Sequence, residues 1–404
     1  MKKLWGNRLF YVVLILCTAA AVLLMTQMAE AALFKVNSTE DFGDADPGDG
    51  VCMTLTGACT LRAAVQEANA LAGADEIRLK PAVYRLTNTG ADEDLAATGD
   101  LDITDSVTIK GKGDTMTVVD GHHSDRVFHI IGPGPVVSFV GLKIQNGAVL
   151  GVGGGISNEG ATLIVNSCTI TNNIIVGICG GGVYSSEGSL KILSSRVIQN
   201  EVYGAPAAGG GICSSDDTSL KIIGTKVAHN FASVLEDDPI ILNDGAWGGG
   251  IAITGTTAVK IKSSKVLGNN VSNSGSMDEL ASLGAGIAIL TVINAEIIDT
   301  RIANNSATGL RGGHGGGVFA GDSNVTFSGC TITENSSVGG IGGLGGGMYL
   351  WSEGEPMTIT LYNLSSVTDN FASSGGGIYK NGPVALNISA DSVVTGNLQN
   401  DIFP

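Results

Sequence analysis

The sequence has 404 residues, of which 60 are glycine, 43% are hydrophobic and only 15% are charged, and its formal net charge is −16. This acidic balance excludes nucleic acid as a favoured partner, because phosphate contacts need clustered Lys and Arg side chains. The hydrophobic fraction also excludes a disordered glycine-rich linker, which would contain much less Ile and Val.

The first residues of the chain have the pattern of an export signal. Basic side chains within the first eight positions precede an apolar run over residues 9–25, and the small residues Ala29 and Ala31 follow it. This pattern predicts a secretory signal peptide over residues 1–31. The run is shorter than the ~20 residues of a membrane-spanning helix, so we expect no transmembrane segment after cleavage. Export would place the mature protein outside the cell, at the cell surface or in the periplasm.

Residues 32–90 lack the repeated signatures of the rest of the chain. An acidic stretch lies near their start. Asp44, Asp46 and Asp49 precede Gly50 and form a weak candidate site for calcium, the one cofactor that the sequence suggests. The stretch loosely matches Asp-rich calcium loops but lacks the bidentate Glu about twelve positions along that closes them. The alternative interpretation is a solvated acidic turn.

A short loop and a helix follow the acidic stretch. Cys52 and Cys59 flank the loop and are the favoured pair for a disulfide in an oxidising compartment. Thr60 then precedes apolar residues at i, i+3, i+4 and i+7, which predicts one amphipathic helix with a Thr N-cap. We expect this helix to cover the open N-terminal end of the repeats, and strand-like runs after it to form the first, irregular coils.

The remaining residues, 91–404, contain two repeated signatures in step with each other. The first is a glycine-rich triplet followed by an apolar residue, at Gly153–Ile156, Gly180–Val183, Gly209–Ile212, Gly248–Ile251, Gly284–Ile287, Gly315–Val318, Gly345–Met348 and Gly375–Ile378. The second is an apolar residue followed three places later by Asn, at positions 173, 200, 230, 269, 305, 335, 370 and 397. Alternating, β-branched stretches between these signatures predict short strands joined by turns.

These observations predict an all-β fold, a right-handed single-stranded parallel β-helix of the pectin-lyase-like solenoid class with a short N-terminal capping helix. Each coil of ~30 residues would add one strand to each stacked sheet. The Asn side chains would then form a hydrogen-bonded ladder, and the glycines would supply positive φ or close backbone approach. Cys168 and Cys330 share a register but are roughly 24 Å apart at ~4.8 Å per coil, so we expect buried thiols there.

Residues 59–64, Cys-Thr-Leu-Arg-Ala-Ala, with the Asp-rich stretch before them and Glu67-Ala68-Asn69 after them, resemble the CSLREA domain. The repeats are similar to the Gly-Gly-Ala-Ile and Phe-x-x-Asn repeats of polymorphic outer membrane proteins, with Ile or Val in place of Phe. The resemblance implies an exported repeat protein with no activity established for the family. Ala63 replaces the Glu of the motif. The chain ends at Pro404 without the outer-membrane barrel of those proteins, so a self-inserting autotransporter is not expected.

Three consecutive coils place an aromatic side chain at the same position. If Met348 and Leu350 point inward, Tyr349 points outward, and Phe319 and Tyr379 occupy the matching positions. Such a strip is a candidate for binding sugar rings of a polysaccharide or cell-surface component. The alternative is that the three rings only stabilise the sheet as cross-strand pairs.

Two insertions, at residues 231–247 and 271–283, lie between the Asn corner and the glycine triplet and emerge from the same edge. We expect them to gather a candidate rim of charged residues, namely Glu236, Asp237, Asp238, Asp278, Glu279, Arg311 and His314. Gly313-His314-Gly315 also resembles one short element of polygalacturonases. Ordinary solvated loops are the alternative.

These features suggest two functions. For neither of them does the sequence identify a catalytic residue. The first is a non-enzymatic secreted or cell-surface protein in adhesion, envelope structure or glycan binding. The second is a polysaccharide lyase, hydrolase or epimerase, in which paired carboxylates of the rim would perform acid–base cleavage.

Overall fold

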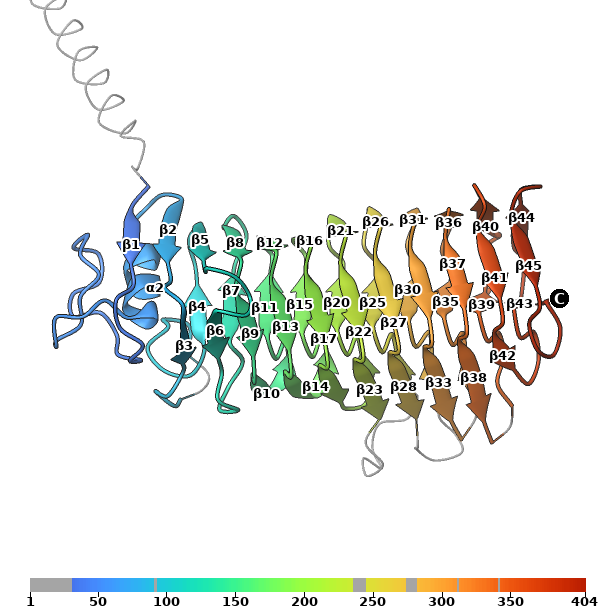
Figure 1. The fold of residues 1–404 in the computed structure, drawn as a ribbon, viewed down its shortest axis with the longest axis horizontal. Helices are drawn as coiled ribbons and strands as arrows, with labels where there is room; N and C mark the ends of the chain where they lie inside the picture. The colour runs from blue at the N-terminus through green and yellow to red at the C-terminus, as the bar shows by residue number, and fades with distance from the viewer. Residues whose placement is uncertain (1–30, 91–92, 235–244, 274–281, 311, 341) are drawn as a thin grey trace, which may run out of the picture.

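The computed structural model describes residues 31–90, 93–234, 245–273, 282–310, 312–340 and 342–404, so the predicted signal peptide lies outside them apart from Ala31. The described chain is a right-handed parallel β-helix whose coils stack along one axis (Figure 1). This confirms the predicted fold. No helix in the described ranges is long and apolar enough to cross a membrane.

Three sheets form the body, and every strand pairs with its equivalent in the next coil. Sheet I contains β1 (Leu33–Lys35), β2 (Asp75–Arg78), β5 (Val107–Lys110), β8 (Val136–Val140), β12 (Thr162–Asn166), β16 (Ser189–Leu193), β21 (Ser219–Ile223), β26 (Val259–Lys262), β31 (Ala295–Ile298), β36 (Val325–Ser328), β40 (Met357–Tyr362) and β44 (Val384–Ile388). Sheet II contains β3 (Ala82–Arg85), β6 (Thr117–Asp120), β9 (Lys143–Gln145), β13 (Thr169–Thr171), β17 (Arg196–Ile198), β22 (Lys226–Ala228), β27 (Lys265–Leu267), β32 (Arg301–Ala303), β37 (Thr331–Thr333), β41 (Ser366–Thr368) and β45 (Val393–Thr395). Sheet III contains β4 (Leu101–Ile103), β7 (Phe128–Ile131), β11 (Ile156–Glu159), β15 (Val183–Ser186), β20 (Ile212–Ser215), β25 (Ile251–Thr254), β30 (Ile287–Leu290), β35 (Val318–Gly321), β39 (Met348–Trp351), β43 (Ile378–Asn381) and β46 (Ile402–Phe403).

A fourth sheet projects from the body, and we call it the flange (Figure 1). Its outgoing strands are β10 (Ala148–Val152), β14 (Ile174–Cys179), β18 (Glu201–Tyr203), β23 (Phe231–Val234), β28 (Asn270–Asn273), β33 (Ser306–Gly309), β38 (Ser336–Gly339) and β42 (Phe371–Ala372). Its returning strands are β19 (Ala207–Ala208), β24 (Ala246–Trp247), β29 (Ser282–Leu283) and β34 (Gly313–His314). The described ends of both predicted insertions, in β23, β24, β28 and β29, belong to this element. Its two layers enclose a small core of Ala and Val side chains together with Ile175.

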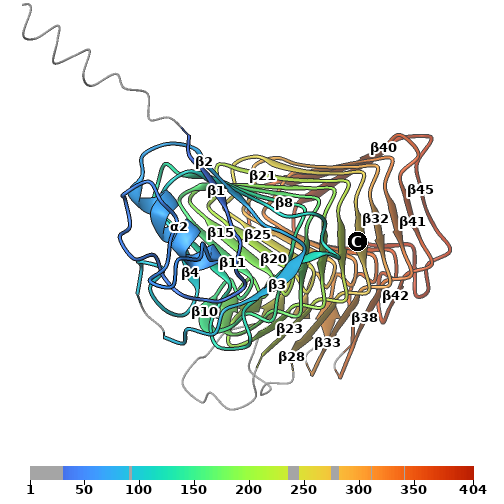
Figure 2. The same ribbon diagram turned by 60° about the vertical axis from the view of Figure 1, so that its left-hand side comes forward.

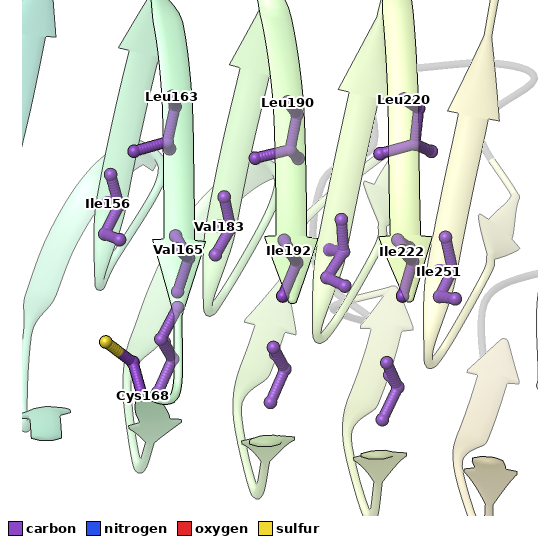
Figure 3. Packing of buried hydrophobic residues seen from close by; sticks show 14 of the residues in the cluster. Ile156, Leu163, Val165, Cys168, Val183, Leu190, Ile192, Leu220, Ile222 and Ile251 are labelled. Carbon is purple, nitrogen blue, oxygen red and sulfur yellow. The ribbon is translucent and has the colours of Figure 1, made fainter. Parts of the chain in front are cut away.

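Identical or similar apolar side chains form columns inside the body. Leu163, Leu190 and Leu220 are aligned partners in successive coils of sheet I, and all three are fully buried (Figure 3). Alternation puts every second residue of a strand into this core, and a fully buried Leu contributes roughly 1.5–3 kcal/mol. The cluster continues from Phe34 to Ile378, so the first strands and the later repeats share one interior.

The Asn ladder is present as predicted, at the corner between sheet II and the flange. Each Nδ2 donates to the Oδ1 of the next Asn at 2.9–3.0 Å, from Asn173 through to Asn397. The backbone N–H of each Asn donates to the same Oδ1, as from Asn230 to Asn269 at 3.1 Å. Each corner is therefore tied to the next by two hydrogen bonds.

The glycine triplets combine both predicted roles. The first glycine has positive φ, as at Gly180 (78°), and any side chain on the third would collide with the Asn ladder. A Cβ on Gly182 would lie 2.6 Å from the carbonyl oxygen of Gly211 and 2.9 Å from Nδ2 of Asn200. Side chains at these positions would separate the coils.

The N-terminal end is covered by α2 (Leu61–Ala70), as expected (Figure 2). The hydroxyl of Thr60 accepts a hydrogen bond from the N–H of Ala63 at 3.0 Å, which confirms the predicted N-cap. Helix α2 turns Leu61, Ala64 and Val65 into the core. Strands β1 and β2 belong to the same sheet as the later coils, so cap and solenoid are continuous.

The structure contains the predicted Cys52–Cys59 disulfide and a second, unpredicted one, Cys179–Cys213. The second disulfide joins β14 of the flange to β20 of sheet III. Cys168 and Cys330 are buried free thiols, as predicted.

Candidate functional site: a charged hollow beside the first coils

An open hollow of about 650 Å³ lies where the first coils meet the start of the flange. One wall is apolar and comes from β10 and β14, with Ala148, Val149, Leu150, Ile174 and Val176. The other wall is polar and comes from the segment before β4 and from the turn and strand of β7, with Glu93, Asp94, Asp100, Ser124, Asp125, Arg126 and His129.

His129 stands at the centre of the polar wall. It is the second residue of β7, where Phe128 and Ile130 point into the core and the imidazole points outward. Its Nδ1 lies 3.3 Å from Oδ1 of Asp102 and 3.8 Å from Oδ1 of Asp94. Its Nε2 lies 3.4 Å from Oε1 of Glu159. The imidazole is therefore surrounded by three carboxylates.

Among the three carboxylates around His129, that of Asp102 is held in place by the fold. Strand register places it beside His129, and its side chain is fully buried. Its Oδ2 accepts a hydrogen bond from the N–H of Ala96 at 2.8 Å. Its Oδ1 points toward the imidazole and accepts no hydrogen bond from any described residue.

The charged groups of the polar wall shift one another's pKa values. Burial, followed by the nearby Asp102 and Asp125 carboxylates, raises the pKa of Asp100 to about 7. Burial also raises the pKa of Asp125. Burial alone would lower the pKa of His129, but the carboxylates of Asp102, Glu159 and Asp100 raise it overall. Arg126 partly balances the wall, with Nε 2.8 Å from Oδ2 of Asp100.

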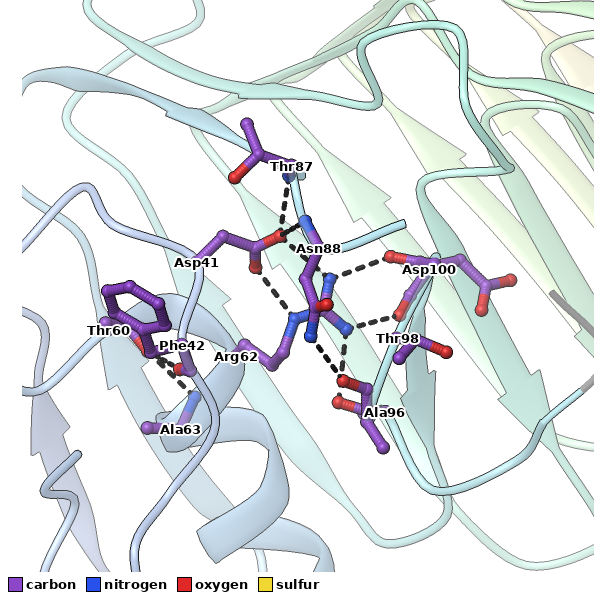
Figure 4. A network of polar contacts seen from close by, with 12 residues as sticks. Asp41, Phe42, Thr60, Arg62, Ala63, Thr87, Asn88, Ala96, Thr98 and Asp100 are labelled. Atoms are coloured by element: carbon purple, nitrogen blue, oxygen red, sulfur yellow. Dashed lines mark hydrogen bonds and ion pairs between the residues drawn. The ribbon is translucent and has the colours of Figure 1, made fainter. Parts of the chain in front are cut away.

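Buried Arg62 of helix α2 holds the segment that carries these carboxylates. Its guanidinium pairs with Asp41 through Nε at 2.7 Å and donates to the carbonyl oxygens of Ala96, Gly99 and Asp100 at 2.7–3.1 Å (Figure 4). A bidentate Arg–carboxylate pair with further backbone acceptors is a rigid arrangement.

Two more side chains of α2 contact the same segment. Gln66 donates to the carbonyl oxygen of Ala96 at 3.0 Å, and Asn69 donates to that of Asp102 at 2.8 Å. Arg62, Gln66 and Asn69 are spaced i, i+4 and i+7 and so lie on one face of the helix. The Arg in the Cys-Thr-Leu-Arg stretch thus positions the polar wall.

The acidic stretch before the helix is a backbone-stabilised turn. Asp44 accepts hydrogen bonds from the N–H groups of Asp46 (3.0 Å) and Met53 (2.7 Å), and Asp49 accepts one from Val51 (2.8 Å). Among the described residues, the group of metal-binding type that the fold brings together is Asp94, Asp102 and His129. Asp44, Asp46 and Asp49 do not form such a group, and calcium binding by this turn stays a prediction.

The predicted rim is described only at His314, because Glu236, Asp237, Asp238, Asp278, Glu279 and Arg311 lie outside the described residues. The ring of His314 packs against that of Tyr349, with centroids 4.8 Å apart and planes tilted by 32°. Burial lowers the pKa of His314. A Cβ at Gly313 would lie 2.0 Å from the carbonyl oxygen of Ala307, so the two layers of the flange touch there. Packing of the flange therefore explains the Gly-His-Gly tripeptide.

The aromatic strip has the predicted register but is largely covered. Phe319, Tyr349 and Tyr379 stack at 5.8 and 5.6 Å, and Phe403 continues the stack at 5.0 Å. Phe319 and Tyr349 are only 3% and 6% exposed. Side chains of the returning flange strands, including Trp247 and Leu283, pack over them. Sugar binding by this strip stays a prediction, with Tyr379 and Phe403 as its partly accessible rings.

Sequence reasoning did not find Asp102 and His129, although one signal pointed to them. Both occupy the outward register of sheet III that also holds Tyr349, as the second residue of a strand between two apolar residues. Extending the aromatic register toward the N-terminus would have placed them side by side. The segment near Phe128 has no glycine triplet, so the repeat pattern does not predict a coil there.

The stack of parallel coils, the Asn ladder and the glycine triplets define a parallel β-helix protein. The family model for the right-handed β-helix region matches residues 154–364, and the chain belongs to that family. Among solved structures, the chain is similar to the A-module of mannuronan C-5 epimerase AlgE4 from Azotobacter vinelandii. The identity is 14%, the match covers 90% of this chain and 100% of that chain, and the TM-score is 0.30. A search of curated proteins found no match.

Proposed function

We propose that this protein is exported and binds a glycan in the hollow, as a component of the cell surface or its surroundings. The observation that carries the proposal is the chemical contrast between the two walls. Leu150 is 81% exposed on the apolar wall, and the polar wall offers carboxylate, hydroxyl and imidazole groups. A sugar ring has an apolar C–H face and a rim of hydroxyls, so it complements such a site.

The charge of the hollow narrows the class of glycan. Glu93, Asp94, Asp100 and Asp125 line it with one basic side chain, Arg126, which already pairs with Asp100. An acidic surface repels polyanions. The favoured ligand is therefore a neutral or amino-sugar polysaccharide rather than a polyuronate.

Other features support export and a scaffolding role. Two disulfides suit an oxidising compartment, and the resemblance of residues 59–64 to the CSLREA domain agrees with a surface protein. A solenoid tied at every corner by paired hydrogen bonds is suited to present a site at a fixed distance from its far end.

The test is a glycan array followed by calorimetry with neutral, amino-sugar and uronate oligosaccharides. Leu150→Ser removes the main apolar contact and should weaken binding at least about tenfold, since burying one Leu contributes roughly 1.5–3 kcal/mol. Leu364→Ser is the matched control, because Leu364 is 75% exposed and distant from the hollow lining. Equal affinities in the two variants, or preference for uronates, would contradict the proposal.

A second candidate function is acid–base cleavage of the same glycan. An aspartate and a histidine that face each other beside an open hollow can act as a general base pair. Incubation with a polysaccharide panel and measurement of released reducing ends tests this function. Turnover that disappears in His129→Gln would establish it, and binding without any release of ends would leave the protein as a lectin-like component.

A further inference from the structure

We propose that Asp94, Asp102 and His129 form a binding site for a divalent transition-metal ion, with Zn²⁺ as the best-fitting ion. Each aspartate offers one carboxylate oxygen and the imidazole one ring nitrogen, and these ligand atoms all lie within 4.8 Å of one another. Metal–ligand distances of about 2.0–2.2 Å place neighbouring ligand atoms of a tetrahedral site about 3.4 Å apart. The observed separations from Nδ1, 3.3 and 3.8 Å, bracket that value.

The side chain of Asp102 points to a ligand independently of this clustering. It is fully buried, and its Oδ2 is fixed by the N–H of Ala96. Its Oδ1 accepts no hydrogen bond within the described part of the chain, although it faces the group. Its nearest polar neighbour is Nδ1 of His129 at 3.3 Å. A buried carboxylate oxygen without a well-aligned donor is costly, and a cation at this position would satisfy it.

The other ring nitrogen of His129, Nε2, is buried and makes no hydrogen bond within the described residues, but a carboxylate stands beside it. Oε1 of Glu159 lies 3.4 Å from Nε2, on the side of the ring opposite to Nδ1. Metal-ligating histidines commonly donate their second N–H to a carboxylate, which fixes the tautomer and the ring orientation. Strand β7 pairs with β11, in which Ser157 is the partner of His129. Glu159 lies two residues further along β11.

The ligand chemistry selects the class of ion. One imidazole nitrogen with two carboxylate oxygens suits Zn²⁺ and related transition metals, whereas Ca²⁺ takes six to eight oxygen ligands. Asp94 is 71% exposed, so the fourth position opens toward solvent and the hollow. An open position leaves room for a water molecule or a ligand hydroxyl.

The experiment uses untagged full-length protein that has been stripped with a chelator. Zn²⁺ alone is titrated by calorimetry, and Co²⁺ is added in parallel because its visible absorption reports a nitrogen- and oxygen-ligated site. The variants are His129→Gln, Asp102→Asn, Asp94→Asn and Glu159→Gln. The matched controls are His229→Gln and Asp391→Asn, which change exposed side chains elsewhere.

We expect one Zn²⁺ per chain in the wild type and in both controls. Binding should fall at least about 100-fold in His129→Gln, and about 10- to 100-fold in Glu159→Gln, the usual effect of removing such an outer partner. Asp94→Asn should weaken binding with an unchanged melting temperature, because this exposed side chain does not support the fold. A decrease in that variant therefore cannot come from unfolding.

Three results would overturn the proposal: no Zn²⁺ binding by the wild type, wild-type affinity in both His129→Gln and Asp94→Asn, or Ca²⁺ binding of equal strength at the same site. The titration contains no glycan, so its outcome is independent of the glycan proposal. A variant that loses zinc binding but keeps glycan binding, or the reverse, would show that the two proposals stand or fall separately.

Discussion

Single buried polar residues decide much of the local chemistry, and Asp217 is an example in the turn between sheets III and I. Its side chain is fully buried, with Oδ1 accepting from the Ser185 hydroxyl and the Gly188 N–H at 3.0 Å and Oδ2 accepting from the Ser214 hydroxyl at 2.6 Å. Burial nevertheless raises the pKa of Asp217 above its ordinary value, and the neighbouring Asp216 adds to the rise.

This shift predicts the sign of a pH effect on stability. A carboxyl whose pKa is raised by folding binds its proton more tightly in the folded state, so its contribution is most favourable below the unfolded value, near 4. That contribution is lost as the pH rises through the folded pKa. The melting temperature of the wild type should therefore fall relative to Asp217→Asn between pH 3 and pH 7. A difference that stays flat, or grows in favour of the wild type, would contradict the burial argument.

At the scale of elements, the Asn ladder and the glycine triplets hold the coils in register. Asn269 accepts from the N–H and Nδ2 of Asn230, and it donates to Asn305 and to the carbonyl oxygen of Val227 at 3.0–3.2 Å. Removing its amide leaves several buried polar groups without partners. Each such group costs about 1–3 kcal/mol.

Asn269→Ala should therefore lower the free energy of unfolding by about 3 kcal/mol or more. Asn397→Ala is the natural comparison, because Asn397 is the last member of the ladder and is partly exposed. Water can replace its lost bonds, so the decrease should be clearly smaller. Denaturant unfolding of both variants measures the difference, and similar losses would show that the ladder is energetically unimportant.

The repeats could be predicted because each signature residue has one strict backbone requirement. Gly180 needs positive φ and Asn200 needs a partner one coil away, so both leave a periodic trace in the sequence. The flange left no such trace, because its returning strands are two residues long, such as Ala207–Ala208, too short to show alternation.

The same missing element explains why the sequence did not show how the aromatic strip is covered. Alternation correctly turned Tyr349 outward, but the cover over its ring comes from the flange, which was not predicted. The Cys179–Cys213 disulfide was missed for the same reason, since it joins the flange to sheet III across 34 residues. The hollow depends on contacts between α2, β4 and β7 that only the tertiary structure brings together.

At the scale of the whole molecule, the cap and the candidate site form one unit. Arg62 reaches from α2 to the carbonyl oxygens of Gly99 and Asp100, next to the carboxylates of the hollow. In a solenoid each unit contacts only its neighbours, so damage at one end is local. The cap is therefore both a cover for the core and the support of the polar wall.

Arg62→Met should destabilise the cap strongly, because it leaves the buried Asp41 carboxylate unpaired, and breaking such a pair costs about 3–5 kcal/mol. Limited proteolysis should cut the cap region first and leave residues 154–364 resistant, and zinc and glycan binding should both be lost. Arg196→Met removes an ion pair with Asp114 that is partly exposed, so it should cost less than about 1 kcal/mol. Equal sensitivity of the two variants to protease would contradict this view.

The Asn ladder also has an electrical consequence. Every side-chain amide from Asn173 onward donates toward the C-terminal neighbour, so the amide dipoles are aligned along the axis. Aligned dipoles accumulate partial positive charge at one end, as they do in an α-helix, and strengthen one another. At that end, Asn397 donates from Nδ2 to Oδ1 of Asp401 at 3.0 Å, and its backbone N–H donates to the same oxygen. The ladder is therefore polarised from Asn173 to Asn397, and the Asp401 carboxylate supplies the negative charge that its positive end favours.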